Sequence, residues 1–353
     1  CINHSNADRL KICDVNVGQT NLQIVCGAPN IKVGLTVPVA LVGAKIDTFE
    51  IRKTKIRGIE SDGMICSGAE LGMNDNHEGI MELDPSLKVG KSLNKALMLE
   101  NDTIFDFDLT PNRGDCFSHL GIARELSIIE NQEIKFSKPL FNTSKFKTTD
   151  LINVDVENSD ICKRYACRII KNIKVADSPD WLKNQLSIIG EKSINNIVDL
   201  ANFIMFDSGQ PLHIFDYDKI NGKNITVRLA KNRESILCLN KDKKNLSNDD
   251  IVISDSQGPI AIAGIIGGYD SQVDENTKNI LVESAVFNEI YIRKTSKKHN
   301  YSKEASKRFE RGVDYANVLN AMNNFTKFLS NMTNVEIANN LIDLETQKYN
   351  IKN

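Results

Sequence analysis

Short runs rich in β-branched residues, bounded by turn residues, recur along the first 98 residues of the chain. Their spacing of roughly 8–13 residues and the lack of sustained helical periodicity predict a small antiparallel β-barrel. Helical signal is confined to short stretches such as residues 67–72. The strand-like runs are residues 10–18, 22–30, 36–46 and 49–58.

The last of these runs, FEIRKTKIRG, alternates apolar and basic residues. Two interpretations stay open: the basic side chains contact an RNA backbone, or they belong to an edge strand whose lysines deter aggregation. The alternation places four basic side chains mostly on one exposed side, namely Arg52, Lys53, Lys55 and Arg57.

The pattern changes at Thr103, and a connecting strand–turn–helix unit with a linker is expected over residues 99–150. Residues 103–110 alternate strictly, which predicts a strand, and the PNRGD that follows has turn chemistry. Ser118 to Asn131 has the periodicity of an amphipathic helix, and the polar residues 141–150 are expected to form a linker. The apolar face of that helix is made by Leu120, Ala123, Leu126, Ile128 and Ile129.

Strand and helix patterns are mixed over residues 151–330, so the chain as a whole is expected to be an α+β multidomain protein. Residues 331–353 are expected to be a linker toward further domains. Helices are predicted at residues 178–190, with Ser178 as N-cap and Gly190 as C-cap, and at residues 193–209. Strands are predicted at residues 153–158, 164–170, 224–230, 234–240, 250–256, 259–268 and 279–287.

Charge and length narrow the class of protein. The chain has 353 residues with 44 Lys and Arg against 46 Asp and Glu, which excludes a generally basic nucleic-acid coat and leaves RNA binding to local patches. The longest uncharged apolar stretch, residues 259–268, is half the ~20 residues that a membrane helix needs, so a soluble protein with no membrane contact is expected. The chain starts on Cys1 with no signal or transit segment, and it is expected to be a piece of a longer protein.

The cysteines and histidines do not predict a metal site. None of the eight cysteines stands in a CxxC pair, and the five histidines are scattered singly. Several cysteines lie inside apolar runs, where a reduced cysteine behaves as a small hydrophobe. We therefore expect no bound metal and a reducing, cytoplasmic compartment.

The strongest local charge bias lies at residues 288–311, which carry eight Lys and Arg against three Glu. A solvated helix face and a track for an RNA backbone are both consistent with this excess of positive charge. The candidate RNA contacts in this segment are Arg293, Lys294, Lys297 and Lys298.

Three features could carry chemistry. Glu283 interrupts an apolar strand, and a carboxylate there either points to solvent or is buried for a purpose, because an unpaired buried charge costs several kcal/mol. The glycines near Gly267 match neither a dinucleotide-binding motif nor a P-loop, so they mark either a close approach of the backbone or a pocket for a small polar ligand. His213 follows a proline turn, where a lone histidine is more often structural than catalytic.

Several longer motifs carry a resemblance to a known family. Four of them, HSNADRL, IVCGAPNIKVG, VPVALVGAKI and KIRGIESDGMICSGAELG, resemble the inserted tRNA-binding domain of bacterial phenylalanine–tRNA ligase β subunits, an oligonucleotide-binding (OB-fold) barrel. LTPNRGDCFSHLGIARELS, IVDLANFIMFDSGQPLHIFD, AIAGIIGG and ASKRFERGVD follow in an order and spacing specific to the same subunit. The chain therefore resembles this subunit over essentially its whole length.

The resemblance implies a tRNA-binding barrel at residues 1–98, without its first strand, and an editing domain at residues 151–330. Such a domain hydrolyses tyrosine wrongly attached to phenylalanine tRNA. Glu283 matches the glutamate that recognises the tyrosine hydroxyl, helped by Gly267, and Ala305 matches a small residue that leaves room for the ring.

The remaining pocket residues also come from the resemblance. His213 and Asn202 match residues that lie near the terminal adenosine of the tRNA and the scissile ester. This chain departs from the family at Ala201 and Lys303, where a hydroxyl residue such as threonine is frequent. Either change affects where a water molecule is held.

The resemblance finally implies the partners: tRNA(Phe) and an α subunit, in an α2β2 heterotetramer whose α subunit performs aminoacylation. No cofactor is expected in this chain, whereas ATP and Mg²⁺ are expected for the complete ligase. Two alternatives stay open, a free-standing trans-editing hydrolase and a non-catalytic tRNA-binding and assembly module with a decayed editing site.

Overall fold

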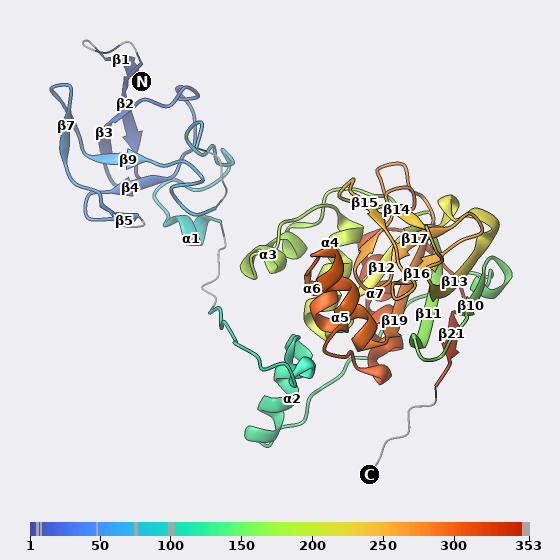
Figure 1. Cartoon of the computed structure of the whole chain (residues 1–353). Coiled ribbons are helices and arrows are strands. Elements are labelled where there is room, and N and C mark those ends of the chain that lie inside the picture. The colour runs from blue at the N-terminus through green and yellow to red at the C-terminus, as the bar shows by residue number, and fades with distance from the viewer. Residues whose placement is uncertain (5–6, 8, 47–48, 74–76, 98–102, 348–353) are drawn as a thin grey trace. The chain divides into compact units, whose positions relative to one another are not determined.

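The computed structural model describes the whole chain except residues 5–6, 8, 47–48, 74–76, 98–102 and 348–353. It divides into two compact units, Cys1–Thr103 and Ile104–Asn353, which we call unit 1 and unit 2 and describe separately (Figure 1). Part of the HSNADRL motif and the expected boundary at residue 98 lie outside the described residues.

Unit 1 is rich in short antiparallel strands around a small core that includes Cys13, Ile24 and Ile65. Three strands form one sheet in the order β1-β2-β3, and the others pair two by two, β4 with β9, β5 with β6 and β7 with β8. The expected strand-rich organisation is present, but the strand pairs of the described residues do not close a barrel. The elements are β1 (Ile2–Asn3), β2 (Lys11–Asn16), β3 (Asn21–Cys26), β4 (Val39–Leu41), β5 (Lys45–Ile46), β6 (Phe49–Glu50), β7 (Thr54–Ile56), β8 (Ile59–Ser61), β9 (Gly63–Ile65) and α1 (Leu93–Ala96).

The run at residues 49–58 is not one strand, as the alternation predicted. It is divided between β6 and β7, and the side chain of Ile51 is buried at the break. Arg57 and Gly58 then form the turn between β7 and β8, with φ angles of 50° and 90°. Two positive φ angles match the right-handed twist of a two-residue hairpin. Residues 67–72 form turns rather than a helical stretch.

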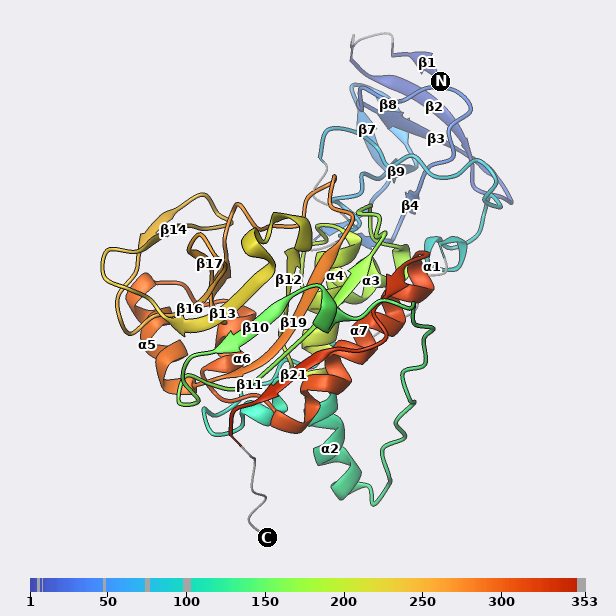
Figure 2. The same cartoon turned by 90° about the vertical axis from the view of Figure 1, so that its right-hand side faces the viewer.

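Unit 2 contains two five-stranded sheets, a two-stranded sheet of β14 and β15, and a set of helices (Figure 2). One five-stranded sheet has the order β10-β13-β16-β17-β18, and the other has the order β12-β19-β11-β20, with β21 also paired to β11. The strands are β10 (Asn153–Val156), β11 (Cys162–Lys171), β12 (Leu212–Asp216), β13 (Asn224–Leu229), β14 (Ser235–Leu237), β15 (Lys243–Asn245), β16 (Ile251–Ser254), β17 (Pro259–Ile262), β18 (Ile266–Gly267), β19 (Ile280–Phe287), β20 (Glu336–Ile337) and β21 (Ile342–Glu345).

All eight residues of β19 are buried, because each face of this strand packs against a different layer. Leu281 and Ala285 belong to the core shared with the β10–β18 sheet. Val282 and Val286 instead pack with the helices α3, α4 and α7. The helices are α2 (His119–Ile129), α3 (Asp180–Ile188), α4 (Asn196–Ser208), α5 (Glu289–His299), α6 (Glu304–Phe309) and α7 (Val318–Met332), with single 3₁₀ turns at Gly114–Cys116, Thr148–Asp150, Tyr217–Lys219, Asn221–Lys223 and Tyr315–Asn317.

The expected helices are present, but several of their ends are shifted. The helix expected from residue 193 begins at Asn196, and Gly190, expected as a C-cap, directly follows the C-cap Ile189 of α3 at φ +80°. The helix expected at residues 118–131 is α2, whose N-cap Ser118 accepts a hydrogen bond from the Gly121 amide. Gly209 ends α4 in the left-handed conformation. Ser178 is not the N-cap of α3, because α3 begins two residues later and the Ser178 hydroxyl donates to Asp199 instead.

Two other expectations also differ from the structure. Residues 103–110 alternate in polarity but form no strand, since no other described strand pairs with them. Residues 331–353, expected to be a linker, contribute β20 and β21 to the sheet around β11. Among the described residues, no helix is long and apolar enough to cross a membrane.

Candidate functional site

A cavity of about 210 Å³ opens in unit 2, and residues from both five-stranded sheets line it. Its walls are largely apolar, with Leu239 on one side and Phe309 on another. Four residues singled out from the sequence line it together, namely His213, Gly267, Glu283 and Ala305. The cavity is smaller than the ~300–1,000 Å³ of a drug-sized site, so its size suits one amino-acid side chain.

Strand register brings the polar groups of the cavity together. Glu283 in β19 lies opposite His213 on one neighbouring strand and opposite Cys167 on the other. Residues directly opposite one another in a sheet have neighbouring side chains on the same face. His213 and Glu283 are therefore adjacent although 70 positions separate them in the sequence.

Glu283 is a buried carboxyl group, with 4% of its surface exposed. The hydroxyl of Tyr165, itself fully buried, donates a hydrogen bond of 2.8 Å to Oε2 of Glu283. Burial raises the pKa of Glu283 to about 8, and the hydrogen bond from Tyr165 opposes that rise. The alternative in which this side chain points to solvent is therefore excluded.

His213 is held neutral by its surroundings. Removal from solvent lowers the pKa of its imidazole to about 4. The ring meets Phe215 edge-on, with 4.3 Å between the ring centroids. At neutral pH this side chain offers one donor and one acceptor nitrogen rather than a positive charge.

The glycines of residues 264–268 allow close approaches. A Cβ on Gly267 would lie 2.6 Å from Cε1 of His213, and one on Gly268 would lie 2.6 Å from the carbonyl oxygen of Ile260. Gly264, at φ +66°, packs against Phe309. The close approach of the backbone is therefore confirmed. Gly264 and Gly267 also line the cavity, whereas a pocket for a small polar ligand stays a prediction.

Asn202 does not line this cavity. It lies with Ala201 on α4, at a second hollow of about 440 Å³. Four residues line both hollows: Pro211, Leu212, Lys303 and Ala305. The site therefore has two adjoining compartments, and the ammonium of Lys303, 5.6 Å from the ring centroid of Tyr301, lies where they meet.

The basic residues of unit 1 face acidic partners. Lys53 pairs with Glu60 at 3.1 Å and with Asp62 at 3.0 Å. Lys55 lies 3.8 Å from Glu60, and Arg52 pairs with Glu50 at 3.4 Å. Arg57 is exposed in the β7–β8 turn. These pairs reduce the positive potential that the basic run alone would create.

The basic residues of α5 differ from one another. Lys298 donates to Asp250, a fully buried carboxylate, at 2.6 Å. Arg293, Lys294 and Lys297 are exposed, and none of them forms an ion pair with a described residue. Three cations on one helix are thus available to a polyanion.

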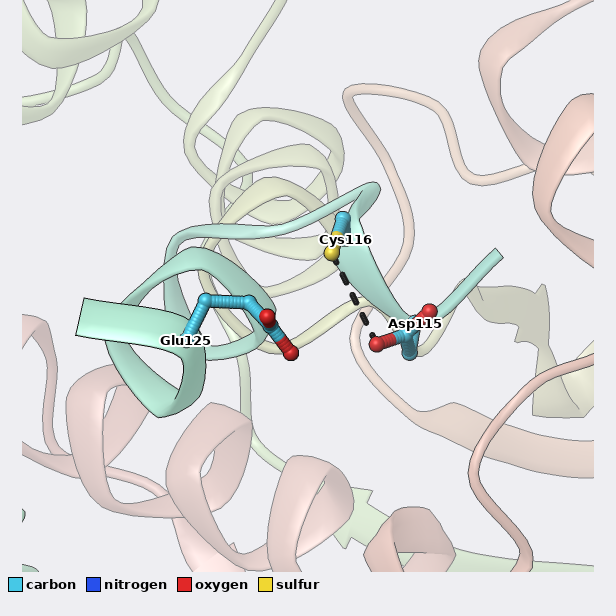
Figure 3. A group of neighbouring side chains, drawn as sticks. All are labelled: Asp115, Cys116 and Glu125. Carbon is cyan, nitrogen blue, oxygen red and sulfur yellow. Dashed lines mark hydrogen bonds between the residues drawn. The ribbon is translucent and has the colours of Figure 1, made fainter. Parts of the chain in front are cut away.

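One group of side chains resembles a metal site. The ligand atoms of Asp115, Cys116 and Glu125 lie within 4.8 Å of one another (Figure 3). The guanidinium of Arg113 donates to all three, at 2.8 Å to Asp115, 2.9 Å to Cys116 and 2.7 Å to Glu125. Because a cation already satisfies these acceptors, the group holds α2 in place and does not indicate a metal ion.

Tyr165 is the residue of this site that the sequence pattern did not single out. The alternation of residues 164–170 marks Tyr165 and Cys167 as one face of a strand. Nothing in that pattern pairs this strand with β19, so the contact with Glu283 follows only from the register in the folded sheet.

Comparison with known proteins adds independent findings. A family model described as "Putative tRNA binding domain" matches residues 1–92, and one described as "B3/4 domain" matches residues 161–334. The chain is 42% identical over 350 residues to the phenylalanine–tRNA ligase beta subunit of Protochlamydia amoebophila, covering 98% of this chain and 43% of that protein. It is 43% identical over 347 residues to the beta subunit of Fusobacterium nucleatum, with the same coverage.

The chain thus spans a little under half the length of the curated relatives that it matches. A solved N-terminal piece of the phenylalanyl-tRNA synthetase beta subunit from Pyrococcus horikoshii aligns with 67% of this chain and 65% of that chain, at 18% identity and a TM-score of 0.38. That likeness is too low to establish a common fold.

Proposed function

Because the chain belongs to the family of phenylalanine–tRNA ligase beta subunits, we propose that it supplies such a ligase with tRNA binding and with hydrolytic editing of mischarged Tyr-tRNA(Phe). The observation that carries this proposal is the buried carboxyl group of Glu283 in a small, largely apolar cavity. The cavity suits an aromatic ring, and the carboxyl group suits one hydroxyl on that ring.

Selectivity follows from the cost of an unpaired polar group. Tyrosine and phenylalanine differ by one hydroxyl. A site built to hydrogen-bond a hydroxyl discriminates against the analogue that lacks it by a factor of ~10⁴–10⁵ in kcat/KM. A tyrosine ring next to Ala305 brings its hydroxyl to Glu283, whereas phenylalanine leaves the carboxyl group without a second partner. The pocket would therefore spare correctly charged tRNA.

Hydrolysis of the ester needs a positioned water molecule and stabilisation of the oxyanion. In our proposal neutral His213 orients the ester or the terminal adenosine rather than acting as a general base, and backbone amides near Gly267 or hydroxyls of the tRNA stabilise the oxyanion. Asn202 in the second compartment then holds the terminal adenosine.

RNA binding is proposed for two surfaces. Unit 1, matched by the tRNA-binding family model, would act as an OB-fold module. On unit 2 the exposed cations Arg293, Lys294 and Lys297 would contact the tRNA backbone. Phosphate contacts of this kind supply affinity without reading sequence.

The partners and cofactors of the whole enzyme are part of the same proposal. The chain would assemble with an α subunit into an α2β2 ligase that uses ATP and Mg²⁺ for charging, while this chain holds neither. All eight cysteines are free thiols, which agrees with a cytoplasmic protein.

The decisive experiment is a deacylation assay on tyrosyl- and phenylalanyl-tRNA with the wild type and with Glu283→Ala. We expect the wild type to hydrolyse the tyrosyl ester and the variant to lose that activity. Hydrolysis that Glu283→Ala leaves untouched would refute the site assignment. Intact tRNA binding without any hydrolysis would favour the second candidate, an assembly module, which the presence of Ala201 and Lys303 at the second compartment supports.

A further inference from the structure

Glu283 lies between the cavity and Tyr165. One of its oxygens, Oε2, accepts the hydrogen bond from the Tyr165 hydroxyl at 2.8 Å. Glu283 lines the cavity and Tyr165 does not. The carboxyl group is thus held from behind by a phenol that is fully buried in the core between the two sheets.

A contact of this kind limits how the carboxyl group can turn. The terminal torsion angle of glutamate, χ3, is broad and roughly two-fold. An unrestrained carboxyl group therefore rotates about this bond, and its two oxygens exchange positions. A hydrogen bond on Oε2 removes that freedom and leaves Oε1 as the oxygen available to a ligand. Groups held in place in advance discriminate better, because they do not have to be ordered when the ligand binds.

We propose that Tyr165 is a positioning residue for selectivity: it fixes Glu283 so that one carboxyl oxygen is presented to the hydroxyl of a tyrosyl ligand in the cavity. This inference rests on the proposed editing function and adds to it a residue that does not touch the substrate. Tyr165 also offers Glu283 the same chemical group as the ligand does, so the carboxyl group would lie between two phenols in the occupied site.

The surroundings of Glu283 contain few other charged groups that could take this role. The sulfur atoms of Cys162 and Cys167 are thiols, because burial raises the pKa of both far above the neutral range. Among the described residues, the titratable groups that face Glu283 or line its cavity are Tyr165, Cys162 and Cys167 on β11, His213 on β12, and Tyr301 and Lys303 just before α6.

The test is Tyr165→Phe, which keeps the buried ring and removes only the hydroxyl. We expect the ratio of kcat/KM for tyrosyl-tRNA over phenylalanyl-tRNA to fall by about threefold to tenfold, the effect of losing one hydrogen bond to a neutral carboxyl group. Because that hydrogen bond lowers the pKa of Glu283, its loss also moves the pH profile of tyrosyl-ester hydrolysis to higher pH. A role in packing alone would move neither.

Tyr217→Phe is the matched control. Tyr217 is also buried, and its hydroxyl donates a hydrogen bond of the same length, 2.8 Å, to the carbonyl of Leu151, away from the cavity. We expect this variant to lose stability as Tyr165→Phe does, with selectivity and pH profile unchanged. Equal selectivity in Tyr165→Phe and the wild type would overturn the inference.

Two measurements keep the inference apart from the proposed function. The titration of the Glu283 carboxyl carbon by NMR should move to higher pH in Tyr165→Phe, and the preference for L-tyrosinamide over L-phenylalaninamide should fall. Neither needs hydrolysis, so a wild type that fails to deacylate Tyr-tRNA(Phe) refutes the proposed function alone. An unchanged titration and an unchanged preference would refute the role of Tyr165.

Discussion

Gly267 and His213 are packed so closely that no side chain fits between them: a Cβ on Gly267 would lie 2.6 Å from Cε1 and 3.0 Å from Nε2 of the imidazole. Gly267→Ala must therefore displace His213, and a displacement of about 1 Å at a reacting centre can cost ~10²-fold in rate. We expect tyrosyl-tRNA deacylation to fall by a factor of that order, with tRNA binding retained in a filter-binding assay.

Gly268→Ala provides the contrast. Its added Cβ would meet the backbone carbonyl of Ile260 at 2.6 Å, and backbone moves less easily than a side chain. We expect a lower free energy of unfolding for Gly268→Ala than for Gly267→Ala. Full activity in Gly267→Ala would show that the position of His213 does not matter.

Stability between pH 6.5 and 8 should depend on Glu283. Its pKa is about 8 in the folded protein against an ordinary 4.5, so the folded state binds one more proton than the unfolded state between these values. The free energy of unfolding then falls as the pH rises, by at most about 1.4 kcal/mol per pH unit. His213 acts oppositely between pH 4 and 6.5, where the unfolded state binds the extra proton.

The two effects therefore offset one another at lower pH and leave Glu283 acting alone above pH 6.5. Glu283→Gln, which cannot ionise, should flatten the decrease between pH 6.5 and 8. Urea unfolding at half-unit pH steps measures the slope of the free energy of unfolding against pH. Identical slopes for the wild type and the variant would mean that Glu283 is not held protonated.

The basic side chains of α5 should differ in how much each contributes to tRNA binding. Removing Arg293, Lys294 or Lys297 is expected to weaken tRNA binding and to reduce the slope of log K against log[salt] by ~0.7–0.9 for each phosphate that the variant no longer neutralises. Lys298→Ala is the matched control on the same helix, because its ammonium is committed to Asp250. An equal decrease in slope for all four variants would show that the ion pair does not restrict Lys298.

Asp250 should be important for stability. It is fully buried, and burial alone would raise its pKa, but hydrogen bonds from Lys298, the Ser247 amide and His299 hold the pKa below its ordinary value. Asp250→Asn weakens these hydrogen bonds and is expected to lower the free energy of unfolding by about 2–3 kcal/mol. Asp249→Asn, at an exposed neighbouring position, should stay within about 0.5 kcal/mol of the wild type.

Periodicity predicted the elements of unit 2 well where burial decides them. The strand expected at residues 279–287 is β19, and its apolar residues are buried on both faces. The strand expected at residues 103–110 is absent, although these residues alternate strictly, because a strand also needs a partner to hydrogen-bond. Alternation indicates which side chains would share a face of a strand, and it does not show whether another strand pairs with it.

The helix α2 shows the same limit. Its periodicity predicted an apolar face, and three side chains of that face, Leu126, Ile128 and Ile129, are 52%, 77% and 74% exposed. Periodicity identified the helix but could not show whether anything covers it. For the site, the carboxyl group at Glu283 was recognisable as unusual in an apolar strand, whereas its contact with Tyr165 depends on the register between strands whose contacting residues are 118 positions apart.

The pairing of β20 and β21 with β11 affects how unit 2 should be handled in the laboratory. A recombinant protein trimmed at residue 334, where the match to the B3/4 family model ends, would lack both strands. The long strand that carries Tyr165 would then present unpaired backbone amides and carbonyls to solvent, and exposed edges of this kind recruit other chains into aggregates. Expression of unit 2 in soluble form should therefore require the chain to continue to at least Glu345.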